Sequence, residues 1–206
     1  MAGAFPISSA NFETMGISSV QNTIISKSLS GKKLSRQIDN QRFGFTASII
    51  VGKRSDIYGD LMAFIIKQRS SKENFTIIPP EVEDARGNET GTLAVNGSHT
   101  AGDTTIAIDG FAGDGAGRLK AGDFIKFNGH TKVYMVVADV TSSSNSATVT
   151  IEPPLVSALA DDETVSYDNI PFTVHLTNDI QEFGVVGADN SGNLLYKFEI
   201  DVEEAI

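Results

Sequence analysis

The chain has 206 residues, of which 40% are hydrophobic and 20% are charged, as expected for a folded protein with its own core. It contains no Cys, which excludes disulfides, thiolate metal sites and a thiol nucleophile. The net charge of −10 is uneven, because residues 1–80 carry +5 and residues 81–206 carry −15. An acidic chain repels nucleic acid unless a local basic patch outweighs the repulsion.

The N-terminal residues lack the basic and apolar segments of a signal peptide. No apolar run is long enough for a transmembrane helix. We therefore expect no membrane insertion.

The first region runs to Pro79 and Pro80, and it begins with strand patterns. Gln41–Val51 alternates apolar with small or polar side chains, which predicts a half-buried strand. Ile17–Leu29 is its expected partner in a hairpin, with a turn at Gly31–Lys33.

One helix is expected after these strands, with Ser55 as its capping residue. Its apolar positions follow helical spacing, and cations stand near its end, where the helix dipole favours them. Gly59 is expected to weaken the helix by about 1 kcal/mol relative to Ala. The apolar positions are Tyr58, Leu61, Met62 and Ile65, and the terminal cations are Lys67 and Arg69. A strand over Asn74–Ile78 then precedes the two prolines.

The second region, Glu81–Asp168, reads as short strands separated by turn residues. Five or six such strands at close spacing predict a small closed barrel of the OB type. The predicted strands are Leu93–Val95, Thr104–Ile108, Phe124–Phe127, Lys132–Val140, Ala147–Ile151 and Thr164–Tyr167.

The third region, Ile170–Ile206, returns to longer strands at Phe172–Leu176 and Leu195–Val202. Because they resemble those of the first region, we predict a discontinuous β domain of residues 1–88 and 169–206, interrupted by an inserted barrel of residues 89–168. The expected fold is mainly β: a sandwich or barrel-like domain with one helix, plus the OB-like barrel.

No catalytic, metal or cofactor motif is evident. His99, His130 and His175 lie in separate segments without the spacing of zinc ligands. Gly110–Gly117 resembles a phosphate loop but lacks both the dinucleotide fingerprint and the P-loop Lys. The acidic turns at 161–163 and 189–193 lack the ligand spacing of a calcium loop. We expect no enzyme activity, no metal and no cofactor.

Binding of sugar or nucleic acid has little support in the sequence. There is no Trp, and most aromatic residues fall on the apolar faces of predicted strands or of the helix. Residues 81–168 carry five Lys or Arg against fourteen Asp or Glu, which opposes binding of DNA. The remaining candidate is a basic loop that could contact another copy or a neighbouring protein, and a solvated hairpin turn is its alternative interpretation. It consists of Lys27, Lys32, Lys33 and Arg36.

The order of these segments resembles that of the distal tail proteins of long-tailed phages (siphoviruses), in an arrangement similar to the T5-like type. The resemblance covers nearly the whole chain, and no single motif carries it. Its segments are the polar turn at Ser26–Arg36, QRFGF at Gln41–Phe45, the helix and strand at Tyr58–Pro80, the barrel segment at Gly122–Leu155, FTVHL at Phe172–Leu176, and the terminal YKFEIDVEEAI.

This resemblance implies a structural virion protein of the tail tip, or baseplate, without catalysis and assembled in the cytoplasm of the host bacterium. Its β domain would form a hexameric ring that joins the tail tube protein to the hub and receptor-binding proteins. An OB-like domain would project outward and bind a host surface glycan, another tail protein or neither. No sequence-specific nucleic acid partner is expected. The alternative function is a carbohydrate- or host-surface-binding module of a virion.

Overall fold

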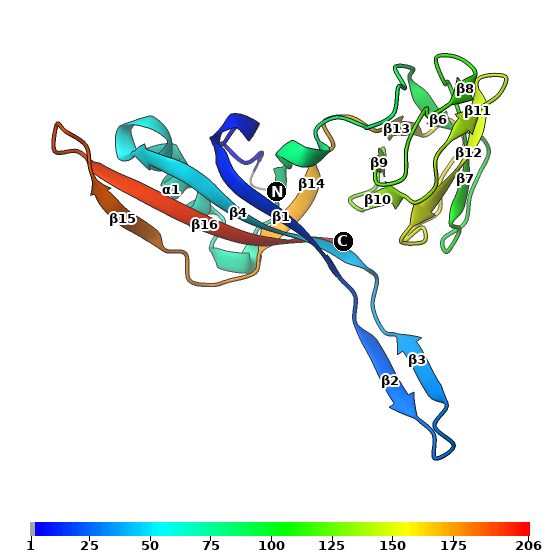
Figure 1. Cartoon of the computed structure of the whole chain (residues 1–206), viewed down its shortest axis with the longest axis horizontal. Coiled ribbons are helices and arrows are strands. Elements are labelled where there is room, and N and C mark those ends of the chain that lie inside the picture. Colours follow the sequence, from blue (N-terminus) through cyan, green and yellow to red (C-terminus); the bar gives the residue numbers. More distant parts are fainter. Residues whose placement is uncertain (1–2) are drawn as a thin grey trace. The chain divides into compact units, whose positions relative to one another are not determined.

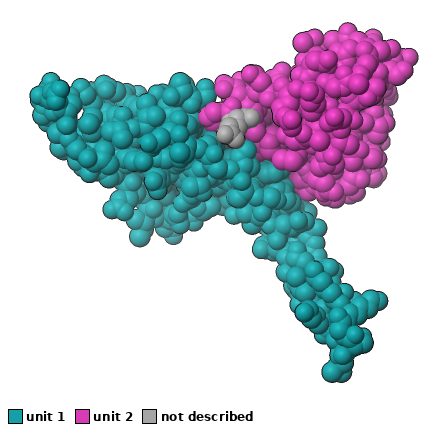
Figure 2. Space-filling model, in the orientation of Figure 1, with its two compact units in different colours: residues 1–77, 173–206 teal, residues 78–172 magenta. Residues whose placement is uncertain are grey.

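The computed structural model describes residues 3–206, so the first two residues of the expected β domain lie outside the described residues. The chain divides into two compact units, residues 1–77 with 173–206 and residues 78–172 (Figure 2). The sequence placed the junctions at 88/89 and 168/169, and that domain division stays a prediction. No helix among residues 3–206 is long and apolar enough to cross a membrane.

The discontinuous unit is built on one large sheet (Figure 1). Its long central strands, β4 and β16, pair antiparallel, and β1 pairs antiparallel with the other side of β4. The edge strand β15 also pairs with β16. The sheet order is β1 (Phe12–Val20), β4 (Arg42–Lys53), β16 (Leu194–Glu204), β14 (Phe172–Leu176) and β5 (Phe75–Ile77), with β15 (Phe183–Ala188) beside β16. A short 3-10 turn, η1 (Ser9–Asn11), precedes β1.

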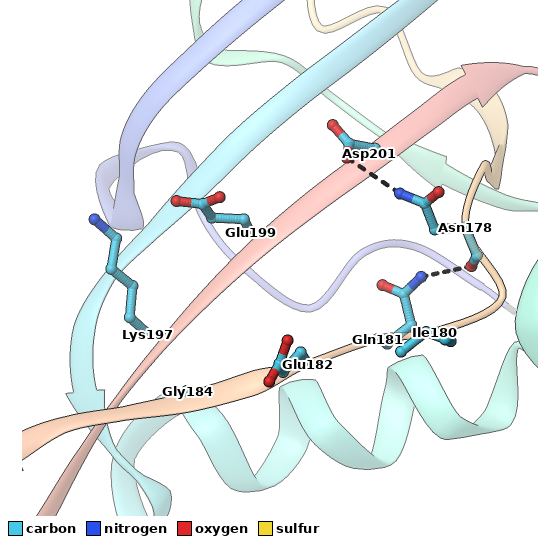
Figure 3. A pocket seen from close by; sticks show the side chains of 8 residues that line it. All are labelled: Asn178, Ile180, Gln181, Glu182, Gly184, Lys197, Glu199 and Asp201. Carbon is cyan, nitrogen blue, oxygen red and sulfur yellow. Dashed lines mark hydrogen bonds between the residues drawn. The ribbon is translucent and has the colours of Figure 1, made fainter.

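One face of this sheet forms the core, as the alternation of the sequence predicts. Phe45 and Ile200 are buried, whereas Thr46 and Asp201 lie on the opposite face and are joined by a hydrogen bond of 2.7 Å. The helix α1 (Gly59–Lys67) adds Leu61 and Ile65 to the buried residues. In Figure 3 the helix lies behind the strands, on the side away from the polar face.

The start of the helix differs from the sequence prediction. A π-helical turn, η2 (Arg54–Tyr58), precedes α1, and Ser55 donates a hydrogen bond to the Asp56 carboxylate instead of capping the helix. Gly59 is the first residue of α1. A Cβ at this position would lie 2.7 Å from the Arg54 carbonyl oxygen. The wide turn brings this carbonyl against Gly59, and glycine is therefore a packing requirement here.

Gly59→Ala is expected to lower the free energy of unfolding by about 1–3 kcal/mol, because the added methyl group overpacks against backbone. Helix propensity alone predicts the opposite sign, a gain of about 1 kcal/mol. Chemical denaturation decides between them, with Asp60→Ala as the control at the next, solvent-exposed position. A stabilised Gly59→Ala protein would contradict the packing argument.

The second unit contains a closed six-stranded barrel. It is formed by the six strands that the sequence predicts, and the mainly β fold with one α-helix is confirmed. The assignment to the OB type stays a prediction. The barrel order is β10 (Val133–Val136), β12 (Ser146–Glu152), β7 (Thr105–Asp109), β6 (Leu93–Val95), β13 (Thr164–Ser166) and β9 (Phe124–Phe127). Two short 3-10 turns, η3 (Ser70–Lys72) and η4 (Pro80–Val82), flank β5 in the chain.

The barrel is filled by apolar side chains from all six strands. Phe127 and Tyr134 are fully buried, and their rings lie 5.5 Å apart between centroids. The Tyr134 hydroxyl accepts a hydrogen bond from the Val156 backbone. The strand pair Phe124–Phe127 and Val133–Val136 therefore belongs to the barrel wall.

Candidate functional site

A two-stranded ribbon, which we call the arm, projects away from the sheet of the discontinuous unit (Figure 1). The arm comprises residues 23–37, with β2 (Thr23–Lys27) paired to β3 (Lys33–Gln37). Its turn is closed by hydrogen bonds from the Gly31 N–H to the Ser28 carbonyl and from the Ser28 N–H to the Lys32 carbonyl. Gly31 has φ +80°, a conformation that favours glycine.

The arm corrects the expected single strand over Ile17–Leu29. Only its beginning, up to Val20, pairs with β4. The chain then passes through an irregular segment, where the Ile38 N–H donates to the Asn22 carbonyl and the Asp39 carboxylate accepts from the Asn40 N–H. The Asp39–Asn40 bond gives the backbone a partner other than the neighbouring strand. The sheet pairing is interrupted here, and β2 and β3 form a separate two-stranded sheet.

All four predicted assembly residues lie on the arm. Lys27 and Lys33 are direct cross-strand partners, Lys32 is in the turn, and Arg36 is opposite Ile24. Like charges placed directly across a strand pair destabilise it. The arm therefore carries four cations, and no acidic residue lies between residues 23 and 37 to balance them.

The arm also has an apolar face, which the sequence analysis missed. Strand alternation places Ile24 and Leu34, together with Ile38 directly after the arm, on the face that also carries Arg36. These three apolar side chains are 54–61% exposed. An isolated two-stranded ribbon is at best marginally stable in water, and a contiguous exposed apolar surface marks an interaction site. The alternation of apolar and polar residues in this segment was the sequence signal that could have revealed this apolar face.

A second surface feature lies on the polar face of the sheet, and we call it the acidic hollow (Figure 3). It has a volume of about 340 Å³ and is formed by β16, the start of β15 and the loop before β15. Three carboxylates and an Ile that is 85% exposed surround it. The lining residues are Asn178, Ile180, Gln181, Glu182, Gly184, Lys197, Glu199 and Asp201.

The charges of the hollow are only partly balanced by neighbours. The Lys197 ammonium lies 2.9 Å from the Glu13 carboxylate, and this contact lowers the pKa of Glu13. The Asp201 carboxylate accepts hydrogen bonds from Thr46 and from Asn178. The pKa of Lys197 is raised mainly by its partner Glu13 and to a smaller extent by Glu199, so Lys197 balances only part of the negative charge of the hollow.

The β15–β16 turn shows how one carboxylate organises the edge of the sheet. Asp189 accepts hydrogen bonds from the Ser191 and Asn193 backbone N–H groups and from the Asn193 side chain. The Lys53 ammonium lies 2.6 Å away. The Asn193 side chain, followed by Lys53, lowers the pKa of Asp189 strongly. The acidic turn at 189–193 is thus a structural element.

Asp189→Asn is expected to lower the thermal midpoint at pH 7 and to lower it by a smaller amount at pH 3, because the contribution of the carboxylate is lost completely only below its strongly lowered folded-state pKa. A carboxyl with a lowered pKa in the folded state stabilises the protein fully above its unfolded-state pKa of about 3.9. That contribution declines as pH falls below this value. Thermal unfolding of both proteins at the two pH values measures the gap. An equal gap at both would contradict the assignment.

The three histidines and the glycine-rich loop, which were also candidates in the sequence, occupy ordinary structural positions in the fold. The His99 ring accepts a hydrogen bond from the Ala107 N–H, and His130 packs edge-on against Phe127. His175 is a half-buried residue of β14. Within residues 3–206, no three His, Cys, Asp or Glu side chains are grouped so that they could hold a metal ion. The glycine-rich loop forms a small ribbon, β8 (Gly115–Ala116) with β11 (Thr141–Ser142).

Residues 82–170 match the family model described as the B domain of the distal tail protein pb9. This segment contains all six barrel strands. A search of curated proteins gave no match. The match confirms the resemblance to the distal tail proteins of long-tailed phages. The match supports a structural role in a phage tail.

Proposed function

We propose that the chain forms a ring at the distal end of the tail tube and joins the tube to the hub and receptor-binding proteins of the tip. The match to the distal tail protein family supports this placement. The main support for assembly is the arm, because an extended ribbon with an exposed apolar face needs a second protein surface to cover it.

Of the four cations predicted to take part in assembly, Arg36 lies on the apolar face of the arm that we propose to be covered, Lys32 is in the turn, and Lys27 and Lys33 lie on the opposite face. Exposed charges on a contact surface steer association and fix its register, and salt screens them. Assembly through Arg36, which the other three cations assist by their charge, is therefore weaker at high ionic strength. The expected partners are copies of the same chain, about six per ring as the resemblance implies, with the tube protein and the tip proteins on the two sides.

The alternative, a glycan-binding barrel, gains no support from the barrel's aromatic residues. Sugar binding uses exposed aromatic faces. Phe111, Phe124, Phe127 and Tyr134 are all at most 6% exposed. The half-buried Tyr167 donates its hydroxyl hydrogen to the Gly91 carbonyl.

Light scattering and negative-stain imaging of the pure protein test the proposal. The expected result is a species of several times 21.9 kDa that images as a ring and dissociates as salt is raised. If the protein is monomeric in solution, imaging of tagged tails decides. Absence of the chain from the tail end would contradict the proposed function.

A further inference from the structure

The apolar face of the arm is uncovered within its own chain. Every residue from Gln21 to Ile38 is exposed, and the arm points away from the sheet that it leaves (Figure 1). The arm leaves the sheet just before β4, beside the end of β16, where Glu203 pairs with Gly44. The acidic hollow lies back along β16, at Lys197–Asp201. The arm therefore points away from its own hollow.

The hollow has the opposite chemistry to the arm. Phe183 of β15 is in register with Phe198 of β16. Glu182 precedes Phe183 and Glu199 follows Phe198, so the two residues come from neighbouring segments of the same chain. Both carboxylates line the hollow, and a cation brought into it is attracted to both. Ile180, at the rim, offers exposed apolar surface of the kind that the arm presents.

We propose that the arm of one copy lies in the acidic hollow of a second copy. Ile24 and Leu34 cover Ile180 of the neighbouring chain, and Arg36, on the same face of the arm, meets the Glu182 and Glu199 carboxylates. The inference rests on the proposed ring function and specifies the surface that receives the arm.

The contact joins two different surfaces of the same chain. Such a heterologous contact repeats from copy to copy, and it generates a closed ring when the rotation between copies closes. It also gives the charge asymmetry a role, because a basic arm and an acidic hollow cannot pair with surfaces of their own kind. One chain then supplies both halves of every contact in the ring.

Cysteine cross-linking tests the contact directly, because the natural chain has no Cys. Leu34→Cys protein is mixed with Ile180→Cys protein at high concentration, and a short bismaleimide is added. The matched control replaces the second partner with Ile66→Cys, which lies on helix α1 and is 74% exposed. The expected result is a cross-linked dimer from the first mixture, well above the level of the control.

Charge exchange gives a second, independent measurement. Arg36→Glu and Glu199→Arg are each expected to abolish the cross-link at moderate salt, and the chain carrying both changes is expected to regain it. A Leu34–Ile180 cross-link no stronger than the control overturns the proposed contact. If rings are nevertheless seen, the proposed function survives that result. Absence of the protein from imaged tails would overturn the proposed function itself.

Discussion

A protein whose arm is replaced by a two-residue Asn-Gly turn is expected to fold normally and to remain monomeric. The replacement joins Asn22 to Ile38, whose backbones are already hydrogen-bonded at 3.0 Å, so the sheet is not strained. No residue of the arm is buried, and exposed residues contribute about 0.5 kcal/mol or less each to stability. The loss falls on assembly alone.

Point variants localise this effect to one face of the arm. Burial of an Ile or Leu side chain contributes about 1.5–3 kcal/mol, so Ile24→Ser with Leu34→Ser is expected to weaken assembly by about a hundredfold or more. Ile25→Ser is the control, because Ile25 lies on the opposite face with Lys27. Sedimentation over a concentration series gives the association constants. Equal effects from both faces would contradict the assignment of the apolar face.

Asp123→Ala is expected to destabilise the barrel by about 2–4 kcal/mol. Asp123 is 3% exposed, and its carboxylate accepts hydrogen bonds from the backbone N–H groups of Arg86, Gly87 and Lys120. Its removal leaves these partly buried backbone donors without their acceptor, and an unsatisfied donor costs about 1–3 kcal/mol when it is fully buried. The carboxylate thereby ties the segment that enters the barrel to the turn before β9.

Asp139→Ala is the matched control for this prediction. Asp139 is also a carboxylate near this turn, but it is exposed and accepts one hydrogen bond, from the Ala121 N–H. Its loss is expected to cost about 1 kcal/mol or less. Urea denaturation of the three proteins compares them. An Asp123→Ala protein as stable as the Asp139→Ala protein would show that the buried carboxylate does not hold the turn.

The barrel was predictable from sequence because its strands are short and its turns carry strong signals. Asn128-Gly129 separates two apolar runs, and these runs became β9 and β10. The start of the helix was not predictable, because capping rules describe α-helices and the chain forms a π-helical turn over Arg54–Tyr58. The buried Tyr58 at the end of that turn donates a hydrogen bond from its hydroxyl to the Ile50 carbonyl of β4, a contact that capping rules do not consider.

The candidate site was predictable only in its local part. The four cations of the arm lie close together in sequence, so charge counting finds them. The hollow depends on the register of β15 against β16 and on the loop before β15. No sequence pattern gives that register, since the pairing includes an irregularity between Val185 and Gly187. That Glu182 and Glu199 line the same hollow is therefore visible only in the folded chain.

Electron microscopy of purified tails that carry a gold-labelled tag on this chain shows where the chain lies in the tail and whether it needs its arm to be there. We expect label in one ring at the distal end of the tube, with about six labels when labelling is complete. When the arm-deleted chain is the only copy, we expect tails without that label. Label spread along the tube, or an unchanged terminal ring built from arm-deleted chains, would contradict the proposed assembly.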